Sequence, residues 1–276
     1  MKLIVCSKED LAGQNIKNVL LSTGDFDSKV VGDYVFHTSE KFAIVEVKER
    51  LIYCDNLDER LSKLVEFDEI VFASRHSSKD GRKIVTAHVS GNVGRADYGG
   101  LPYRLAKPAP VTMKNFSIAV SKKIPDTEYE FTLEATHHGP SEIKKPCAFY
   151  EIGSTEEEWK DEDIAHIVAD AILEALDGEN NWKVAVGVGG THYVPRQTEI
   201  ELNTVFAFAH NFPKYTFQDL TPEFLKYAID LSNAEIIIFD EKSANSKVKQ
   251  LIKEVAEMVG IEAIRSKEAK KFIWDT

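Results

Sequence analysis

The stretch Lys2-Leu3-Ile4-Val5-Cys6 is a short apolar run with two β-branched side chains, which is typical of a buried strand. A helical pattern follows it at 10–21, and this alternation of apolar runs and helical patterns recurs along the chain. Such alternation indicates a largely parallel sheet covered by helices. The predicted strands are 2–6, 30–36, 43–47, 69–73, 84–89, 116–120, 130–135, 183–188 and 235–239, and the predicted helices are 10–21, 156–176, 222–231 and 246–259. We expect an α/β fold of three layers, in which a mostly parallel, mixed central sheet carries helices on both faces.

Three of the predicted helices carry signals at their ends. The spacing Thr155-x-x-Glu158 is a capping box at the start of 156–176. Thr221 followed by Pro222 matches an N-cap and a first helical residue. Gly260 directly after 246–259 is typical of a helix C-terminus.

The 276 residues show no internal repeat and no break in composition, so we expect one domain over 1–276. Apolar runs stay well short of the roughly 18 residues that cross a bilayer. Glu9 and Asp10 follow the first strand at once, which argues against a secretory leader. The three cysteines are odd in number and widely spaced, which favours a reducing compartment and argues against a cysteine-based zinc site. We therefore predict a cytoplasmic protein without a membrane segment.

Charge is distributed unevenly along the chain. The net charge of −11 discourages a polyanionic partner, yet 74–123 hold ten basic side chains against two acidic ones, a local net charge of +8. Residues 151–180 show the opposite bias, with eleven acidic side chains against one basic. Both segments could be solvated faces. Because glycines, Tyr98 and Tyr103 are interleaved with the basic residues, we favour a phosphate-binding surface at 74–123.

Within this basic segment, residues 90–110 contain too many helix and strand breakers for regular structure. The breakers are Gly91, Gly94, Gly99, Gly100, Pro102, Pro108 and Pro110. A long irregular loop in a folded domain is commonly functional, although a plain surface excursion is the alternative.

Most of the eight histidines fall at predicted strand ends or in adjoining loops. The clearest are His76, His88, His137, His138 and His192. A single histidine is more often structural, but ligands of open α/β sheets gather at the carboxyl ends of strands. Four strands that deliver histidine to one edge therefore indicate a site. His37 and His166 look incidental.

A metal is one reading of this histidine set. Glu134 and His137 have the spacing E-x-x-H, and Glu199, Asn203 and His210 could complete a set of oxygen and imidazole ligands that suits zinc. The alternative is histidine acid–base chemistry without a metal. The elbow motif G-x-S-x-G of serine hydrolases is absent.

Gly187-Val188-Gly189-Gly190 follows a predicted strand but leads to Thr191-His192-Tyr193 and then Pro195, so it is no dinucleotide fingerprint. Its glycines instead let backbone N–H groups approach a substrate oxyanion or carboxylate.

Four motifs together resemble the archaeal and plant D-aminoacyl-tRNA deacylase family over essentially the whole chain. They are Ser74-Arg75-His76-Ser77-Ser78, Thr86-Ala87-His88-Val89-Ser90-Gly91-Asn92, Glu134-Ala135-Thr136-His137-His138-Gly139-Pro140 and Gly187-Val188-Gly189-Gly190-Thr191-His192-Tyr193. The resemblance implies a single α/β hydrolase domain with a phosphorylase- or hydrolase-like fold, dependence on zinc, and hydrolysis of the ester between a D-amino acid and the 3′ end of tRNA. It implies no obligate protein partner.

The roles that the resemblance implies are as follows. Water activated by Glu134, His137 and His138 attacks the ester carbonyl. Backbone donors at Gly189 and Gly190, or His192, hold the oxyanion, and His88 or His76 returns a proton to the ribose oxygen. The predicted zinc ligands are Glu134, His137, His138, His192 and Glu199. The predicted phosphate contacts are Arg75, Lys79, Arg82, Lys83, Arg95 and Arg104, and Tyr98 or Tyr103 stacks on the terminal adenine.

Two other classes of protein fit parts of this pattern. A zinc exopeptidase or amidohydrolase acting on peptides needs the histidines but not the basic segment. A non-catalytic RNA-binding protein needs the basic segment but not the histidines.

Overall fold

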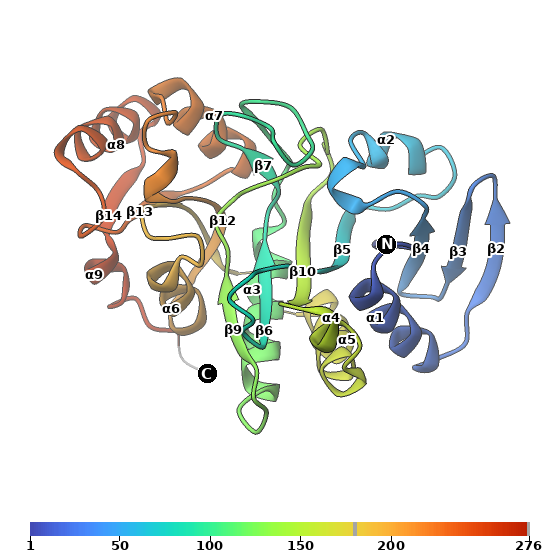
Figure 1. The fold of residues 1–276 in the computed structure, drawn as a ribbon. Helices are drawn as coiled ribbons and strands as arrows, with labels where there is room; N and C mark the ends of the chain where they lie inside the picture. The colour runs from blue at the N-terminus through green and yellow to red at the C-terminus, as the bar shows by residue number, and fades with distance from the viewer. Residues whose placement is uncertain (179–180, 275–276) are drawn as a thin grey trace.

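Two sheets contain most of the strands, and they lie side by side in Figure 1; the computed structural model describes residues 1–178 and 181–274. In spatial order the eight-stranded sheet contains β2 (Asp27–Val31), β3 (Tyr34–Thr38), β4 (Phe42–Val47), β1 (Lys2–Ser7), β5 (Glu69–Arg75), β10 (Cys147–Gly153), β6 (Ile84–His88) and β9 (Glu130–Leu133). The four-stranded sheet contains β12 (Phe206–Phe212), β11 (Lys183–Val188), β13 (Ile236–Phe239) and β14 (Glu262–Arg265). A two-stranded ribbon pairs β7 (Gly91–Asn92) with β8 (Arg104–Leu105).

Helices connect and cover these strands. The α-helices are α1 (Leu11–Ser22), α2 (Leu57–Leu61), α3 (Pro110–Lys123), α4 (Glu156–Trp159), α5 (Glu162–Leu176), α6 (Pro195–Asn203), α7 (Pro222–Ser232), α8 (Ser246–Val259) and α9 (Ser266–Ala269). Two short 3-10 helices are η1 (Leu51–Tyr53) and η2 (Lys214–Thr216).

The sheets are mixed and mostly parallel. Strands β4, β1, β5 and β10 run parallel to one another, as do β6 and β9 and all pairs of the four-stranded sheet. Antiparallel pairing is confined to the β2–β3–β4 meander, the junction of β10 with β6, and the β7–β8 ribbon. The predicted fold class, a mostly parallel mixed α/β arrangement, is confirmed. The strands are, however, divided between two sheets, where the sequence had suggested one central sheet.

Helices cover both faces of the eight-stranded sheet, as predicted. Strand β1 is apolar from Leu3 to Cys6, as expected for a strand whose side chains alternate between two buried faces. Ile4 and Cys6 pack in a core with α1, α3 and α5, whereas Leu3 and Val5 pack in a second core with η1 and α2. Helices α7 and α8 cover the four-stranded sheet in a third core. Helix α3 contacts both β9 and β12 and so joins the two sheets.

Several predicted elements differ from the structure. Residues 116–120, predicted as a strand, lie inside α3, which Pro110 begins and which buries Met113, Phe116 and Val120 at helical spacing. Residues 30–36, predicted as one strand, instead span the turn of the β2–β3 hairpin. Gly32 adopts a positive φ of 60° at this turn. The helix predicted over 156–176 is two helices, α4 and α5, with Asp161 capping the second.

Three strands of the two large sheets, β10, β12 and β14, were missing from the prediction, as were β7 and β8 of the short ribbon. Strand β12 reads Phe-Ala-Phe-Ala-His-Asn-Phe and lacks β-branched residues, whereas β10 carries glutamate and glycine within its run. The predicted helix caps at Thr155, Thr221 and Gly260 are confirmed. Residues 90–110 are largely irregular, as predicted, apart from the short ribbon and the start of α3.

Candidate active site

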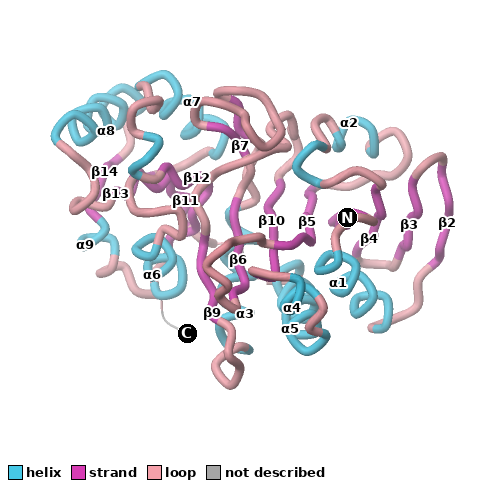
Figure 2. The backbone as a smooth tube through the Cα atoms, in the orientation of Figure 1, coloured by secondary structure: helices cyan, strands magenta, loops and turns pink. Residues whose placement is uncertain are grey.

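The predicted histidines do meet in one cluster beside the eight-stranded sheet. His76 follows β5, His88 ends β6, and Glu134 comes directly after β9, which runs parallel to β6. Because β5 runs opposite to β6 and β9, His76 reaches the cluster from the opposite direction. His137 and His138 continue from Glu134 in the same loop. Figure 2 shows the long loop around β7 above β6 and β10.

The second sheet completes the site. The amide of Ala135 donates to the carbonyl of His192 at 2.7 Å, and the amide of Thr136 donates to the carbonyl of Asn211 at 2.9 Å. These bonds attach the histidine loop to the chain that follows β11 and to β12. His192 thereby reaches the same cluster from the four-stranded sheet.

Glu134 is the centre of this cluster and is fully buried. Its Oε2 accepts a hydrogen bond from His192 Nε2 at 2.7 Å, and its Oε1 lies 3.1 Å from His76 Nδ1. Burial alone would raise the pKa of the Glu134 carboxyl, but the hydrogen bonds from His192 and His76 hold that pKa well below its usual range. The group is therefore an ionised carboxylate inside the protein.

Glu151 is a second buried carboxylate, which the sequence analysis missed. It projects from β10, where its Oε2 lies 3.7 Å from His76 Nδ1 and 3.8 Å from His88 Nε2. Burial opposes the charge of His76, yet its ion pairs with Glu134 and Glu151 raise the pKa of His76 to about 11. His76 is thus an imidazolium between two carboxylates. The sequence signal that could have identified Glu151 is its position as the single acidic residue within the apolar run of β10.

His137 and His138 are held in the opposite protonation state. Desolvation and the neighbouring imidazoles keep the pKa of His137 well below its usual value, and the pKa of His138 is lowered to about 3 for the same reasons. In these neutral rings, His137 Nδ1 donates to the carbonyl of Ala135 at 2.8 Å and His138 Nδ1 donates to that of Gly139 at 2.6 Å. Each ring therefore keeps a lone pair on Nε2, able to accept a proton or bind a metal.

The donors are arranged as a metal site requires. Ligand atoms lie within 4.8 Å of one another in three sets, His88 with His137 and His138, Glu134 with His137 and His192, and His76 with Glu134 and Glu151. His137 Nε2 lies 3.7 Å from Glu134 Oε2, too long for a hydrogen bond. Two ligands about 2.1 Å from a tetrahedral ion are about 3.4 Å apart, so this separation fits a shared ion. The cluster could hold a metal.

A cavity of about 410 Å³ opens onto the cluster. Its lining includes the rings of His76, His137, His138 and His192, with Glu151 behind them. The opposite wall is formed by Arg50, Leu51 and Ile52, by Ser7, Glu9 and Asp10, and by Ser74, Arg75, Ser77 and Tyr98. Of the predicted substrate contacts, Arg75, His76 and Tyr98 reach this cavity.

Other predicted site residues lie elsewhere or are already engaged. Glu199 lies on α6 and pairs with Lys270, in a separate hollow shared with Asn203 and Trp274, so it does not join the predicted zinc ligands. Glu199 lies away from His192 because the chain forms helix α6 between Pro195 and Asn203. His210 is buried behind the cluster, where its Nδ1 lies 3.1 Å from the hydroxyl of Thr136.

The two glycines predicted as oxyanion donors have no free amide. Gly189 N–H donates to the carbonyl of Phe212 and Gly190 N–H donates to Ser243 Oγ, both at 2.8 Å. This part of the prediction is wrong. Both glycines have a positive φ, and a Cβ at Gly189 would lie 2.5 Å from Ser243 Oγ, so glycine is needed there for the close packing against Ser243.

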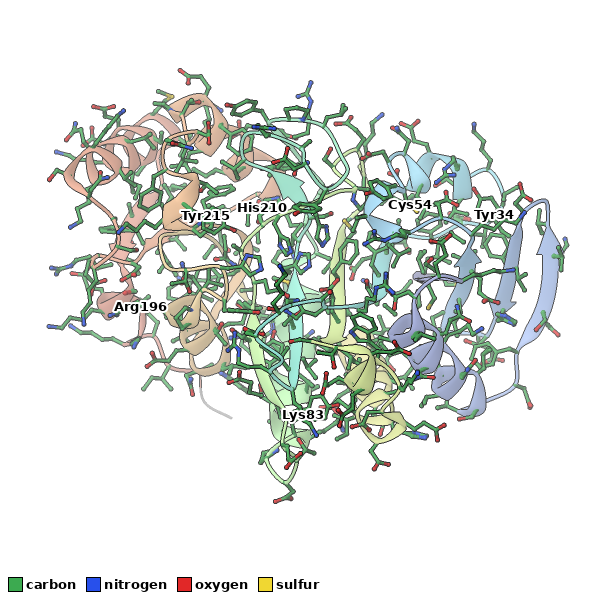
Figure 3. All side chains as sticks on the ribbon, in the orientation of Figure 1. Tyr34, Cys54, Lys83, Arg196, His210 and Tyr215 are labelled. Atoms are coloured by element: carbon green, nitrogen blue, oxygen red, sulfur yellow. The ribbon has the colours of Figure 1, made fainter. Side chains whose placement is uncertain are left out.

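Several cations of the basic segment form ion pairs, some within the segment and some with acids from other parts of the chain. Arg82 pairs with Asp80 and Glu130, and Lys83 pairs with Glu128. Arg95 and Arg104 pair with Asp97 and Glu142. In Figure 3, Lys83 lies near the bottom of the view, below His210 and Tyr215. Sequence proximity could not reveal these pairs.

The fold and the cluster define a class of protein, an α/β protein whose buried imidazole–carboxylate centre opens onto a substrate-sized cavity, as in hydrolases. Residues 64–264 match the family model described as D-aminoacyl-tRNA deacylase. The chain belongs to the D-aminoacyl-tRNA deacylase family, which confirms the expected family.

Individual relatives agree over the full length. A D-aminoacyl-tRNA deacylase from Archaeoglobus fulgidus is 62% identical over 273 residues, covering 98% of each chain. One from Pyrococcus furiosus is 38% identical over 272 residues, covering 96% of this chain and 100% of the other. A crystal structure of a conserved protein of unknown function superposes with a TM-score of 0.98 at 60% identity, covering 100% of this chain and 99% of the other. No helix among the described residues has both the length and the apolar character to span a membrane.

Proposed function

We propose that this chain hydrolyses the ester bond between a D-amino acid and the 3′ end of tRNA, and releases free tRNA and the D-amino acid. Its relatives of matching length bear the name D-aminoacyl-tRNA deacylase, and membership of that family supports the same activity here. The observation that carries the chemistry is the pair of neutral imidazoles, His137 and His138, that line a cavity beside the ionised Glu134.

Glu134, His137 and His192 form the set of residues that we propose to hold a zinc ion. Imidazole and carboxylate are ligands that zinc prefers, and the negative charge of Glu134 offsets part of the charge of the ion. When bound, zinc would supply Lewis acidity and lower the pKa of a bound water toward 7.

His138 is the proton acceptor in this proposal. Its Nδ1–H is occupied by the carbonyl of Gly139, so only Nε2 is available to take the proton of the attacking water. Its ring is neutral and lines the cavity. General base catalysis of this kind contributes about 10²- to 10⁴-fold to a rate.

His76 is the proton donor that we assign to the leaving ribose oxygen. It lines the cavity and is held as an imidazolium by Glu134 and Glu151, with its pKa raised to about 11. A departing alkoxide is a still stronger base than the imidazole, so the transfer is downhill. His88 packs against this arrangement. The centre of its ring lies 5.2 Å from that of Phe149, on which it stacks, and 4.4 Å from that of His137.

For tRNA, we propose that Arg75 and Tyr98 contact the terminal nucleotide, since both line the cavity. Tyr98 is 70% exposed and can offer its ring face to a base. Lys79, Arg95 and Arg104 would follow the phosphates outside the cavity. The pairing of Arg82 and Lys83 with acids makes them poorer candidates than the sequence suggested.

The proposal is tested by incubating the zinc-loaded protein with D-tyrosyl-tRNA, with L-tyrosyl-tRNA, and with short peptides that contain D- or L-tyrosine. We expect release of D-tyrosine and intact tRNA, with little reaction of the L-ester or the peptides. Faster cleavage of the peptides would favour an exopeptidase, and tRNA binding without any hydrolysis would favour an RNA-binding protein.

A further inference from the structure

A continuous series of side-chain contacts, four hydrogen bonds and one ion pair, runs through the active site. Asp80 and Tyr215 are its two ends, and Glu134 lies within it. In order, its members are Asp80, Tyr193, His76, Glu134, His192 and Tyr215. Neither tyrosine was singled out as a functional residue by the sequence.

On one side, the direction of the hydrogen bonds is fixed by Asp80. A carboxylate only accepts, so the hydroxyl of Tyr193 donates to Asp80 Oδ2, at 3.3 Å. The hydroxyl oxygen of Tyr193 therefore accepts a hydrogen bond from His76 Nε2–H, at 3.1 Å. His76 Nδ1–H then faces Glu134, and both ring nitrogens of His76 act as donors.

On the other side, the direction is fixed by Glu134. His192 Nε2–H donates to this carboxylate at 2.7 Å, so in the neutral ring Nδ1 accepts the hydroxyl proton of Tyr215, at 3.1 Å. A tyrosine hydroxyl can both donate and accept. If Nε2 of His192 instead binds an ion, Nδ1 carries the proton and Tyr215 accepts it.

We propose that Tyr193 and Tyr215 are positioning residues, whose hydroxyls set the ring orientation and the donor or acceptor role of His76 and His192 toward Glu134. This inference rests on the proposed function only in that Glu134 and His192 belong to the reacting centre. Tyr193 keeps His76 turned toward the carboxylate. Tyr215 pairs with Nδ1 of His192 in either state of that ring.

The packing of the two tyrosine rings makes it possible to test the hydroxyl groups separately from the rings. The guanidinium of Arg82 lies 4.1 Å from the centre of the Tyr193 ring, and the ring of Tyr215 stacks on His192 with a centroid distance of 6.5 Å. A phenylalanine at either position keeps these ring contacts. Tyr193→Phe and Tyr215→Phe therefore remove the hydrogen bond while leaving the surroundings in place.

Tyr103→Phe is the matched control. Its hydroxyl also bonds to a side chain, Asp219 at 3.3 Å, and the residue is similarly exposed, but it lies outside the series. Zinc affinity of each variant is measured by competition with a chelator. Loss of an outer hydrogen-bond partner of a metal ligand typically lowers affinity or activity 10- to 100-fold. We expect that loss for Tyr215→Phe and no change for Tyr103→Phe.

A second readout uses zinc-free protein labelled with ¹⁵N in histidine, and so is independent of activity. In Tyr215→Phe, the resonance of His192 Nδ1 should move toward that of an unbonded ring nitrogen, and in Tyr193→Phe the resonance of His76 Nε2 should move. Unchanged spectra and unchanged zinc affinity would overturn the inference, even for an active deacylase. Shifted spectra in a protein without deacylase activity would uphold it and contradict the proposed function.

Kinetics separate positioning from substrate contact. Both variants should lower kcat about 10- to 100-fold with the KM for tRNA unchanged. A raised KM with unchanged kcat would mean that the hydroxyls touch the substrate, and the inference would be wrong.

Discussion

Glu134 Oε2 and His192 Nε2 lie 2.7 Å apart, although 58 residues and a change of sheet separate them along the chain. The carboxylate is contributed by the eight-stranded sheet and the imidazole by the four-stranded one. The centre therefore exists only where both sheets are in place, and Glu134 is the residue on which both halves depend.

Glu134→Gln should abolish most activity. The amide keeps the shape but loses the charge that binds His192 and His76, so we expect turnover of D-tyrosyl-tRNA to fall at least about 100-fold. Glu199→Gln is the matched control, since its surface pair with Lys270 contributes at most about 1 kcal/mol. An equal loss in both variants would show that the site was placed wrongly.

His137→Ala and His138→Ala should differ in a defined way. Both should lose about two orders of magnitude in turnover, but only His137→Ala should also lose zinc, because His138 is proposed as a proton acceptor. His166→Ala on the exposed face of α5 serves as the control. Zinc loss in His138→Ala would instead indicate that the ion is bound by His88, His137 and His138.

Chelation should remove activity and added Zn²⁺ should restore it, as expected for a metal held by Glu134, His137 and His192. The measurement is hydrolysis of D-tyrosyl-tRNA before and after dialysis against a chelator, with metal content determined in parallel. Full activity in metal-free protein would contradict the zinc mechanism and favour acid–base catalysis by the histidines without a metal.

The free energy of unfolding should fall as the pH is lowered from about 6.5 to about 3. Burial lowers the pKa of His210 to about 3 in the folded protein, whereas the unfolded chain takes up that proton near pH 6.5. The stability from this residue is present above pH 6.5 and is lost as pH falls through that window, by up to about 1.4 kcal/mol per pH unit.

His210→Gln should flatten this dependence in urea titrations between pH 7 and pH 4, since glutamine keeps a hydrogen-bonding group near Thr136 but does not titrate. His166→Gln should leave the slope as in the wild type. Identical slopes in all three proteins would contradict burial of a neutral His210.

The salt dependence of tRNA binding should identify the cations that meet phosphate. Lys79 is exposed and has no ion pair among the described residues, so Lys79→Ala should reduce the slope of log affinity against log salt by about 0.7–0.9. Lys83→Ala should leave the slope unchanged, because Glu128 already neutralises Lys83. The reverse result would restore the sequence-based prediction for Lys83.

The sequence predicted the site better than it predicted the sheets. Histidines that follow strands were correctly expected to form one site, but the expected reason, a shared strand direction, holds for β6 and β9 and not for β5, which runs opposite to them. Strand β10 and its Glu151 were missed, since a strand that lies between a parallel and an antiparallel neighbour leaves no local signature in the chain. The misplacement of Glu199 has a similar origin, because a short helix turned it away from His192.

The pairing of the basic side chains could not be predicted, for a different physical reason. Local sequence counts the cations of 74–123, but their partners Glu128, Glu130 and Glu142 come from segments that only the fold brings near. The glycine prediction failed in the same manner, since the amide of Gly190 meets Ser243, which lies 53 residues away.

The bonds from Ala135 and Thr136 to the carbonyls of His192 and Asn211 have a consequence for protein synthesis. The histidine loop emerges from the ribosome well before the chain of β11 and β12 that anchors it. A nascent or prematurely terminated chain that ends before β11 contains His137 and His138 but no His192 and no partner for this loop. Such a chain cannot assemble the centre, so hydrolysis of aminoacyl esters requires translation at least through β12, which ends at Phe212.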